Sequence, residues 1–146
     1  MTTPSSPSAP HPVPDAHGTH LYEADAELQA LLPLYLPADL HAHLQPHLRR
    51  LGGLEGGVLD TLALTADHHP PTLEHRSRTG LDAQRIVKHP AYVELERVAF
   101  GEYGLAAMSH RAGVLGCPAP MPPAAKYALT YLFVQAEFGL CCPLSM

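Results

Sequence analysis

The sequence predicts a mainly α fold, a helical bundle-like domain of four to five helices with one short β-hairpin and a disordered N-terminal tail. Three observations predict it. Leucines recur at helical spacing in the first half, residues 71–90 lose that spacing around a Gly-containing turn, and a nearly continuous apolar run follows Pro123. A chain of 146 residues, 46% of them hydrophobic, suits one domain and can bury about two-thirds of its unfolded surface.

The first segment, residues 1–19, predicts a disordered tail, because its Pro, Ser and Thr content offers too little apolar area to offset the entropy of ordering. The folded domain is expected to cover residues 20–146, with structure starting near Leu21. Asp25 suits the N-cap of a first helix. Pro33 is expected to interrupt or end that helix.

Two further helices are expected before residue 70. One runs from Pro37 to Leu51 on a leucine stripe and stops at Gly52-Gly53, because glycine commonly follows a helix end. The next covers residues 54–66 and ends before Pro70-Pro71. The leucines of the stripe are Leu40, Leu44, Leu48 and Leu51.

The period changes between residues 71 and 90. Residues 72–76 and 84–88 flank Ser-Arg-Thr-Gly, which predicts an exposed hairpin. A long helix is then expected over residues 91–109, with its apolar face formed by Tyr92, Leu95, Ala99, Tyr103 and Ala106.

The last helix is expected to start at Pro123 and to end at Gly139. It is apolar almost all round, and such a helix is buried on most sides, so it should lie at the centre of the bundle. Residues 140–146 read as the start of a strand. This final stretch carries no charged side chain, so the chain reads as a protein interrupted at this point.

Composition excludes several classes of function. The formal net charge is -5 and the nine Lys and Arg residues are scattered, which argues against nucleic acid as a partner. Three cysteines are too few for a disulfide framework, which favours a reducing, cytoplasmic location. No apolar run approaches the roughly 20 residues that span a bilayer, and the N-terminus lacks the pattern of a secretory signal.

The histidines are the first candidates for chemistry. His43 and His47 are four residues apart on a predicted helix, with His41 nearby, so a metal site is geometrically possible. No Glu lies between them, and His68-His69 adds no helical spacing. We interpret them as a polar helix surface and assign no metal ligand.

Three other candidates have structural interpretations that we favour. Glu137 is more consistent with a helix-end carboxylate, paired or solvated, than with a general base. His89 precedes a proline and suits a strand-to-helix corner where it caps a backbone group. Cys141 and Cys142 would point to opposite sides of a strand and are more consistent with small buried hydrophobes than with a reactive pair. No catalytic residue is assigned.

Two stretches resemble the acyl-CoA dehydrogenase superfamily, closest to its adaptive-response (AidB-type) branch. Residues 66–73 (Ala-Asp-His-His-Pro-Pro-Thr-Leu) and 80–92 are similar to the end of a helix, a hairpin and a His-Pro-aromatic helix entry in that branch. Residues 135–146 (Gln-Ala-Glu-Phe-Gly-Leu-Cys-Cys-Pro-Leu-Ser-Met) are similar to the family's junction between its N-terminal helical domain and its flavin-contacting β-domain. With residues 21–25, the resemblance spans nearly all of the chain after the tail.

The resemblance implies an FAD-dependent oxidoreductase that carries out α,β-dehydrogenation of an acyl-CoA thioester. It places Ser145 and Met146 at the leading edge of the flavin-binding segment in a complete parent. The catalytic base of most members of the superfamily belongs to the C-terminal domain, so whether this chain is an enzyme stays uncertain. We expect the fragment to bind no FAD and to be catalytically incompetent. The alternatives are a self-standing helical interaction module or the remnant of a disrupted gene, and, less favoured, a His-rich metal-binding protein.

The same interpretation implies partners. In a complete parent the substrate would be of the acyl-CoA type. A last helix that later domains normally cover would expose apolar area here, so we expect a homo-oligomer formed through this helix.

Overall fold

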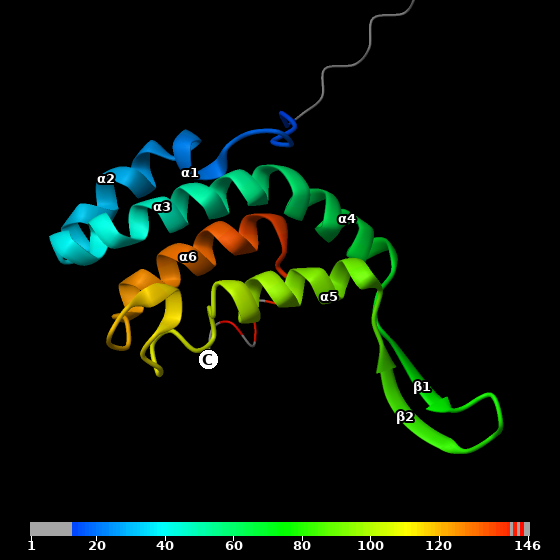
Figure 1. Cartoon of the computed structure of the whole chain (residues 1–146). Helices are drawn as coiled ribbons and strands as arrows, with labels where there is room; N and C mark the ends of the chain where they lie inside the picture. Colours follow the sequence, from blue (N-terminus) through cyan, green and yellow to red (C-terminus); the bar gives the residue numbers. More distant parts are fainter. Residues whose placement is uncertain (1–12, 141, 143, 145–146) are drawn as a thin grey trace, which may run out of the picture.

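The computed structural model describes residues 13–140, 142 and 144. Helical segments that continue into one another form five helices in this part of the chain, and a two-stranded antiparallel hairpin projects from them (Figure 1). The predicted mainly α fold is therefore confirmed. The tail was predicted over residues 1–19, of which residues 1–12 lie outside the described residues.

The first two helices are α1 (Leu21–Ala24) and α2 (Ala26–Tyr35). Asp25 is the N-cap of α2, as predicted, and its carboxylate accepts a hydrogen bond of 2.7 Å from the Leu28 amide. Pro33 does not end the helix, because α2 continues to Tyr35. Proline removes one backbone hydrogen bond, but the helix continues to its C-cap Leu36, whose amide donates to the Leu32 carbonyl and whose side chain is buried in the core.

A long helical run follows, made of α3 (Ala38–Leu54), the π-helix η1 (Glu55–Leu59) and α4 (Asp60–His68). The prediction that a helix stops at Gly52-Gly53 is wrong. Gly52 instead lets α1 pack against α3, because a Cβ here would lie 2.5 Å from the Cβ of Tyr22. The close packing of α1 on α3, and not the end of a helix, explains why residue 52 is glycine.

The segment before α1 lies along the same run. The Gly18 amide donates a 2.6 Å hydrogen bond to the Gly56 carbonyl, and a Cβ on Gly56 would overlap the Thr19 carbonyl oxygen. His17 Nδ1 lies 2.8 Å from a carboxylate oxygen of Asp60. Residues 17–19, expected to be part of the tail, therefore contact η1 and α4 through backbone and side-chain hydrogen bonds.

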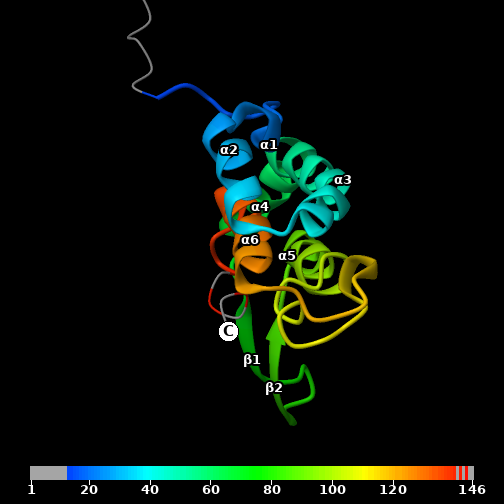
Figure 2. The ribbon, with the colours of Figure 1, turned by 90° about the vertical axis from the view of Figure 1, so that its left-hand side faces the viewer.

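The predicted hairpin is confirmed. Strands β1 (Thr72–Arg76) and β2 (Asp82–Val87) pair antiparallel with Leu73 opposite Ile86. Gly80 in the turn has φ +83°, a conformation that glycine adopts without strain. Figures 1 and 2 show the hairpin extending away from the helices, so its two faces are exposed.

The next helix is shorter than expected. It comprises α5 (Pro90–Glu96) and the π-helix η2 (Arg97–Glu102), and does not reach Ser109. Gly104 has φ +58°, and a Cβ on it would lie 2.9 Å from a methyl of Val114, so the backbone turns away from helical geometry here. A short 3-10 helix, η3 (Val114–Gly116), lies in the following link.

The last helix, α6 (Pro123–Ala136), starts where predicted and packs against α3 and η1. Its central side chains, including Leu129, Leu132 and Phe133, are fully buried. The strand expected after it is not found in the described residues: Cys142 and Leu144 are helical, and the Leu144 amide donates to the Leu140 carbonyl at 3.3 Å. A helical turn satisfies the amide locally and buries Leu144, whereas a strand needs a partner.

None of the helices in the described ranges combines the length and the apolar character that crossing a bilayer would require.

Candidate functional site

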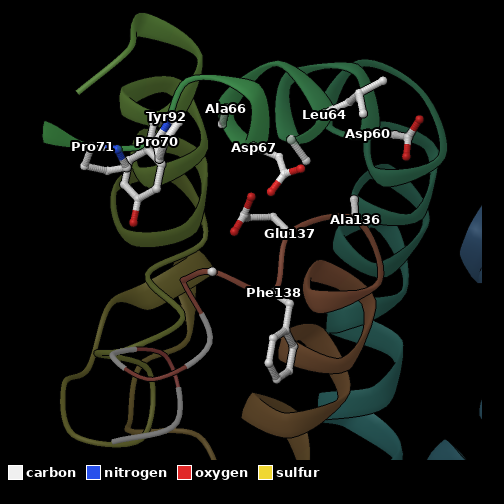
Figure 3. Close-up of a pocket in the computed structure, with 12 residues that line it drawn as sticks. Asp60, Leu64, Ala66, Asp67, Pro70, Pro71, Tyr92, Ala136, Glu137 and Phe138 are labelled. Atoms are coloured by element: carbon white, nitrogen blue, oxygen red, sulfur yellow. The ribbon is translucent and has the colours of Figure 1, made fainter.

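A cleft of about 420 Å³ lies between α4, the start of α5 and the residues at and just after the end of α6 (Figure 3). We call it the acidic cleft. Three of its lining residues are carboxylates, and no Lys, Arg or His of the described chain lines it. Its lining residues are Asp60, Ala63, Leu64, Ala66, Asp67, Pro70, Pro71, Tyr92, Ala136, Glu137, Phe138 and Gly139.

Glu137 is the most buried carboxylate in this cleft, with only 8% of the residue exposed. It follows the last residue of α6 directly and its amide donates to the Phe133 carbonyl, so the helix end fixes its backbone. Figure 3 shows the carboxylates of Glu137 and Asp67 pointing toward one another. No hydrogen bond or ion pair joins the Glu137 carboxylate to another described residue.

This finding refines the interpretation of Glu137. The residue lies at a helix end as expected, it pairs with no cation of the described chain, and its carboxylate faces the open cleft. Gly139 contributes to this arrangement, because a Cβ at Gly139 would lie 2.6 Å from Glu137 Oε1. The backbone of residues 137–139 therefore folds closely around the carboxylate.

Glu55, on the π-helix η1, is a functional candidate that the sequence reasoning missed. It is fully buried, and neither carboxylate oxygen has a hydrogen-bond partner among the described residues. Burial, followed by the negative charges of Glu137 and Asp60, raises the pKa of the Glu55 carboxyl to about 9. A small cavity of about 90 Å³, lined by Glu55, Asp60 and Gln135 among others, lies beside it. The sequence signal that could have indicated Glu55 is a single Glu inside an otherwise apolar helical stretch.

The three histidines of α3 do not converge. The Nε2 atom of His43 lies 2.8 Å from the Leu115 carbonyl oxygen, and that of His41 lies 2.7 Å from Gln45 Nε2. The rings of His43 and His47 are 5.7 Å apart, and burial, followed by His43, lowers the pKa of His47. Within the described ranges, no group of three or more His, Cys, Asp or Glu side chains is arranged to hold a metal.

His89 has the capping role predicted for it. It is the N-cap of α5, and its Nδ1 accepts a 3.2 Å hydrogen bond from the Ala91 amide. Its ring stacks on that of His69 at 4.6 Å, and His69 Nδ1 lies 2.9 Å from the Thr65 carbonyl oxygen. The pair therefore connects the end of α4 to the start of α5, at the base of the hairpin.

The remaining predicted site residues are at the end of the chain. Ser145, Met146 and Cys141 lie outside the described residues, so the flavin-edge assignment stays a prediction. Cys142 is exposed, unlike the buried hydrophobe expected at this position, because the backbone here is helical and turns its side chain outward.

Comparisons with known proteins agree with this architecture. A family model described as the adaptive response protein AidB N-terminal domain matches residues 12–146. A solved structure described as "Bd2924 apo-form" has a TM-score of 0.75 and 26% sequence identity to this chain. The similarity covers 87% of this chain and 24% of the other, so the chain spans about a quarter of that protein's length. No curated protein matches the chain.

Proposed function

Because the chain belongs to the family of adaptive response protein AidB N-terminal domains, we propose that it is the N-terminal helical part of an FAD-dependent acyl-CoA dehydrogenase-like oxidoreductase. The observation that carries the proposal is the match over residues 12–146, which includes both the bundle and the hairpin. In the complete parent, the substrate would be an acyl-CoA thioester and the reaction its α,β-dehydrogenation.

We further propose that the described residues supply no catalytic group for that reaction. FAD and coenzyme A both carry phosphates, and phosphates are bound by cations, backbone amides and helix N-termini. The acidic cleft offers three carboxylates and no cation, so it does not fit either group. Glu137 would have to act as a base in a cleft that repels its own substrate.

The role of the domain in the parent would then be packing. Aromatic side chains on and just after α6 remain exposed, with exposed fractions of 53% for Tyr127, 48% for Tyr131 and 73% for Phe138. Exposed apolar surface of this kind marks interfaces. We propose that further domains, or a second subunit of a homo-oligomer, cover this face of α6.

The cellular setting follows from composition. Three cysteines in 146 residues favour a reducing, cytoplasmic location, and the net charge of -5 argues against nucleic acid as a partner of this domain.

Dye-linked oxidation of acyl-CoA tests the proposal. The purified 146-residue chain, supplied with FAD and a series of acyl-CoA chain lengths, should show no turnover. A complete member of the family in the same assay is the positive control. Turnover by the isolated chain that is lost on Glu137→Gln would overturn the proposal.

A further inference from the structure

Two of the three carboxylates in the acidic cleft, Asp67 and Glu137, pair with no cation of the described chain, whereas Asp60 lies 2.8 Å from His17 Nδ1. Glu137 is more than nine-tenths buried, points into the cleft toward Asp67, and has no described partner (Figure 3). Buried carboxylates are costly unless they meet a cation or a hydrogen-bond donor. The cleft therefore has the chemistry of a receptor for a guanidinium or ammonium group.

The hairpin carries the opposite charge. Residues 72–88 hold four of the nine Lys and Arg residues but only two of the fourteen Asp and Glu residues. Arg76 and Arg85 pair with acids of the hairpin itself. Arg78, in the exposed turn, forms no ion pair with any described residue. Among the described residues, Arg78 at the hairpin tip is therefore a cation without an ion pair, and Asp67 and Glu137 are carboxylates of the cleft without one.

The hairpin also exposes apolar surface. Leu73 and Ile86 are opposite one another on the paired strands and are 52% and 62% exposed, and Leu81 near the turn is 70% exposed. A two-stranded hairpin leaves both outer strand edges unpaired, which makes it a template for pairing with another strand. The hairpin is therefore suited to pack against another polypeptide.

The position of the cleft identifies the polypeptide that fits. Pro70 and Pro71, which line the cleft, directly precede β1, so the cleft lies at the base of the hairpin. Arg78 is six residues beyond Thr72, roughly 20 Å along an extended strand, so it cannot reach the cleft of its own chain. Two hairpins placed side by side in opposite directions bring each tip to the base of the other. This arrangement is two-fold symmetric and closed.

We propose that two copies of this chain associate through their hairpins, with Arg78 of each copy binding the Asp67 and Glu137 carboxylates in the acidic cleft of the other. The proposal does not depend on the function proposed for a complete parent. It also differs from association through the exposed face of α6.

Exchanging the charges of Arg78 and Asp67 tests the proposal, with association measured by sedimentation equilibrium. Both Arg78 and Asp67 are exposed, so Arg78→Asp and Asp67→Arg should fold, which circular dichroism checks. The wild-type chain should dimerise reversibly, and each single variant should raise the dissociation constant about tenfold or more. The double variant should restore association, and added salt should weaken it in the wild type.

Arg111→Asp is the matched control, because Arg111 is also exposed, forms no described ion pair and lies outside the hairpin. Equal weakening by Arg78→Asp and Arg111→Asp would show a general charge effect and overturn the proposal. So would a wild-type chain that stays monomeric, with or without binding of free arginine to the cleft. A dimer that neither single variant weakens would also overturn it.

Discussion

Replacing Glu55 by Gln should stabilise the domain at neutral pH. Glu55 is fully buried on η1, with no hydrogen-bond partner for its carboxylate in the described part of the chain. The folded domain therefore favours the neutral acid, which Gln mimics in size and shape.

The magnitude follows from the pKa of Glu55. Folding raises this pKa from 4.5 to about 9, so above pH 4.5 the unfolded chain gives up a proton that the folded domain retains. The stability is fully present below the unfolded pKa and is lost as pH rises toward the folded pKa, at about 1.4 kcal/mol per pH unit. Between pH 5 and pH 7, this group should lower the free energy of unfolding by about 3 kcal/mol.

Urea denaturation of the wild type and the Glu55→Gln variant at pH 5 and pH 7 measures this effect. The variant should be the more stable protein at both pH values, and its advantage should grow by about 3 kcal/mol from pH 5 to pH 7. Glu27→Gln, on the exposed surface of α2, is the control for loss of a charge. A difference between the wild type and Glu55→Gln that is the same at both pH values would refute the reasoning.

Two further predictions concern packing and capping. Gly52→Ala should destabilise the domain by about 1–3 kcal/mol, because the new Cβ would lie 2.5 Å from Tyr22. Gly57→Ala should stabilise the domain by about 0.5–1 kcal/mol, because no atom lies within 4 Å of the new Cβ and alanine favours the helix. Thermal denaturation compares the two, and equal effects would contradict the close approach of α1 to α3. Asp25→Ala should lower the free energy of unfolding by about 1 kcal/mol, because the Leu28 amide loses its cap. Asp25→Asn should retain most of this stability, because Asn also accepts the hydrogen bond. Equal losses in the two variants would show that capping is not the cause.

Local signals made parts of this fold predictable. The N-cap at Asp25, the start of α6 at Pro123 and the His89 cap all depend on residues adjacent in sequence. The resemblance to the family was also available from the sequence, because it lies in contiguous stretches around the hairpin and the end of α6.

The role of Gly52 was not predictable, because it depends on what lies opposite. A Gly-Gly pair after a leucine stripe indicates a helix end, and only the docking of Tyr22 on α3 shows that the pair continues the helix instead. The end of the helix that begins with α5 was misplaced for a related reason. Gly104 turns the chain at φ +58°, and Val114, in the link that follows, fills the space beside it.

The candidate site was only partly visible in the sequence. Glu137 was singled out as a helix-end carboxylate, but its environment depends on Asp60 and Asp67 of α4. Glu55 was not singled out at all, because nothing in the sequence indicates that η1 turns it toward Glu137. Electrostatic coupling between residues so distant along the chain requires the fold.

We propose that the complete parent of this domain is flavin-dependent while the described residues of the domain do not form the flavin site. Equilibrium dialysis of the purified 146-residue chain against FAD tests the claim most directly, with a complete member of the family as the control. We predict that the chain retains no FAD above the level of the dialysis buffer, because the acidic cleft repels the pyrophosphate. Retention of one FAD per chain would contradict the account.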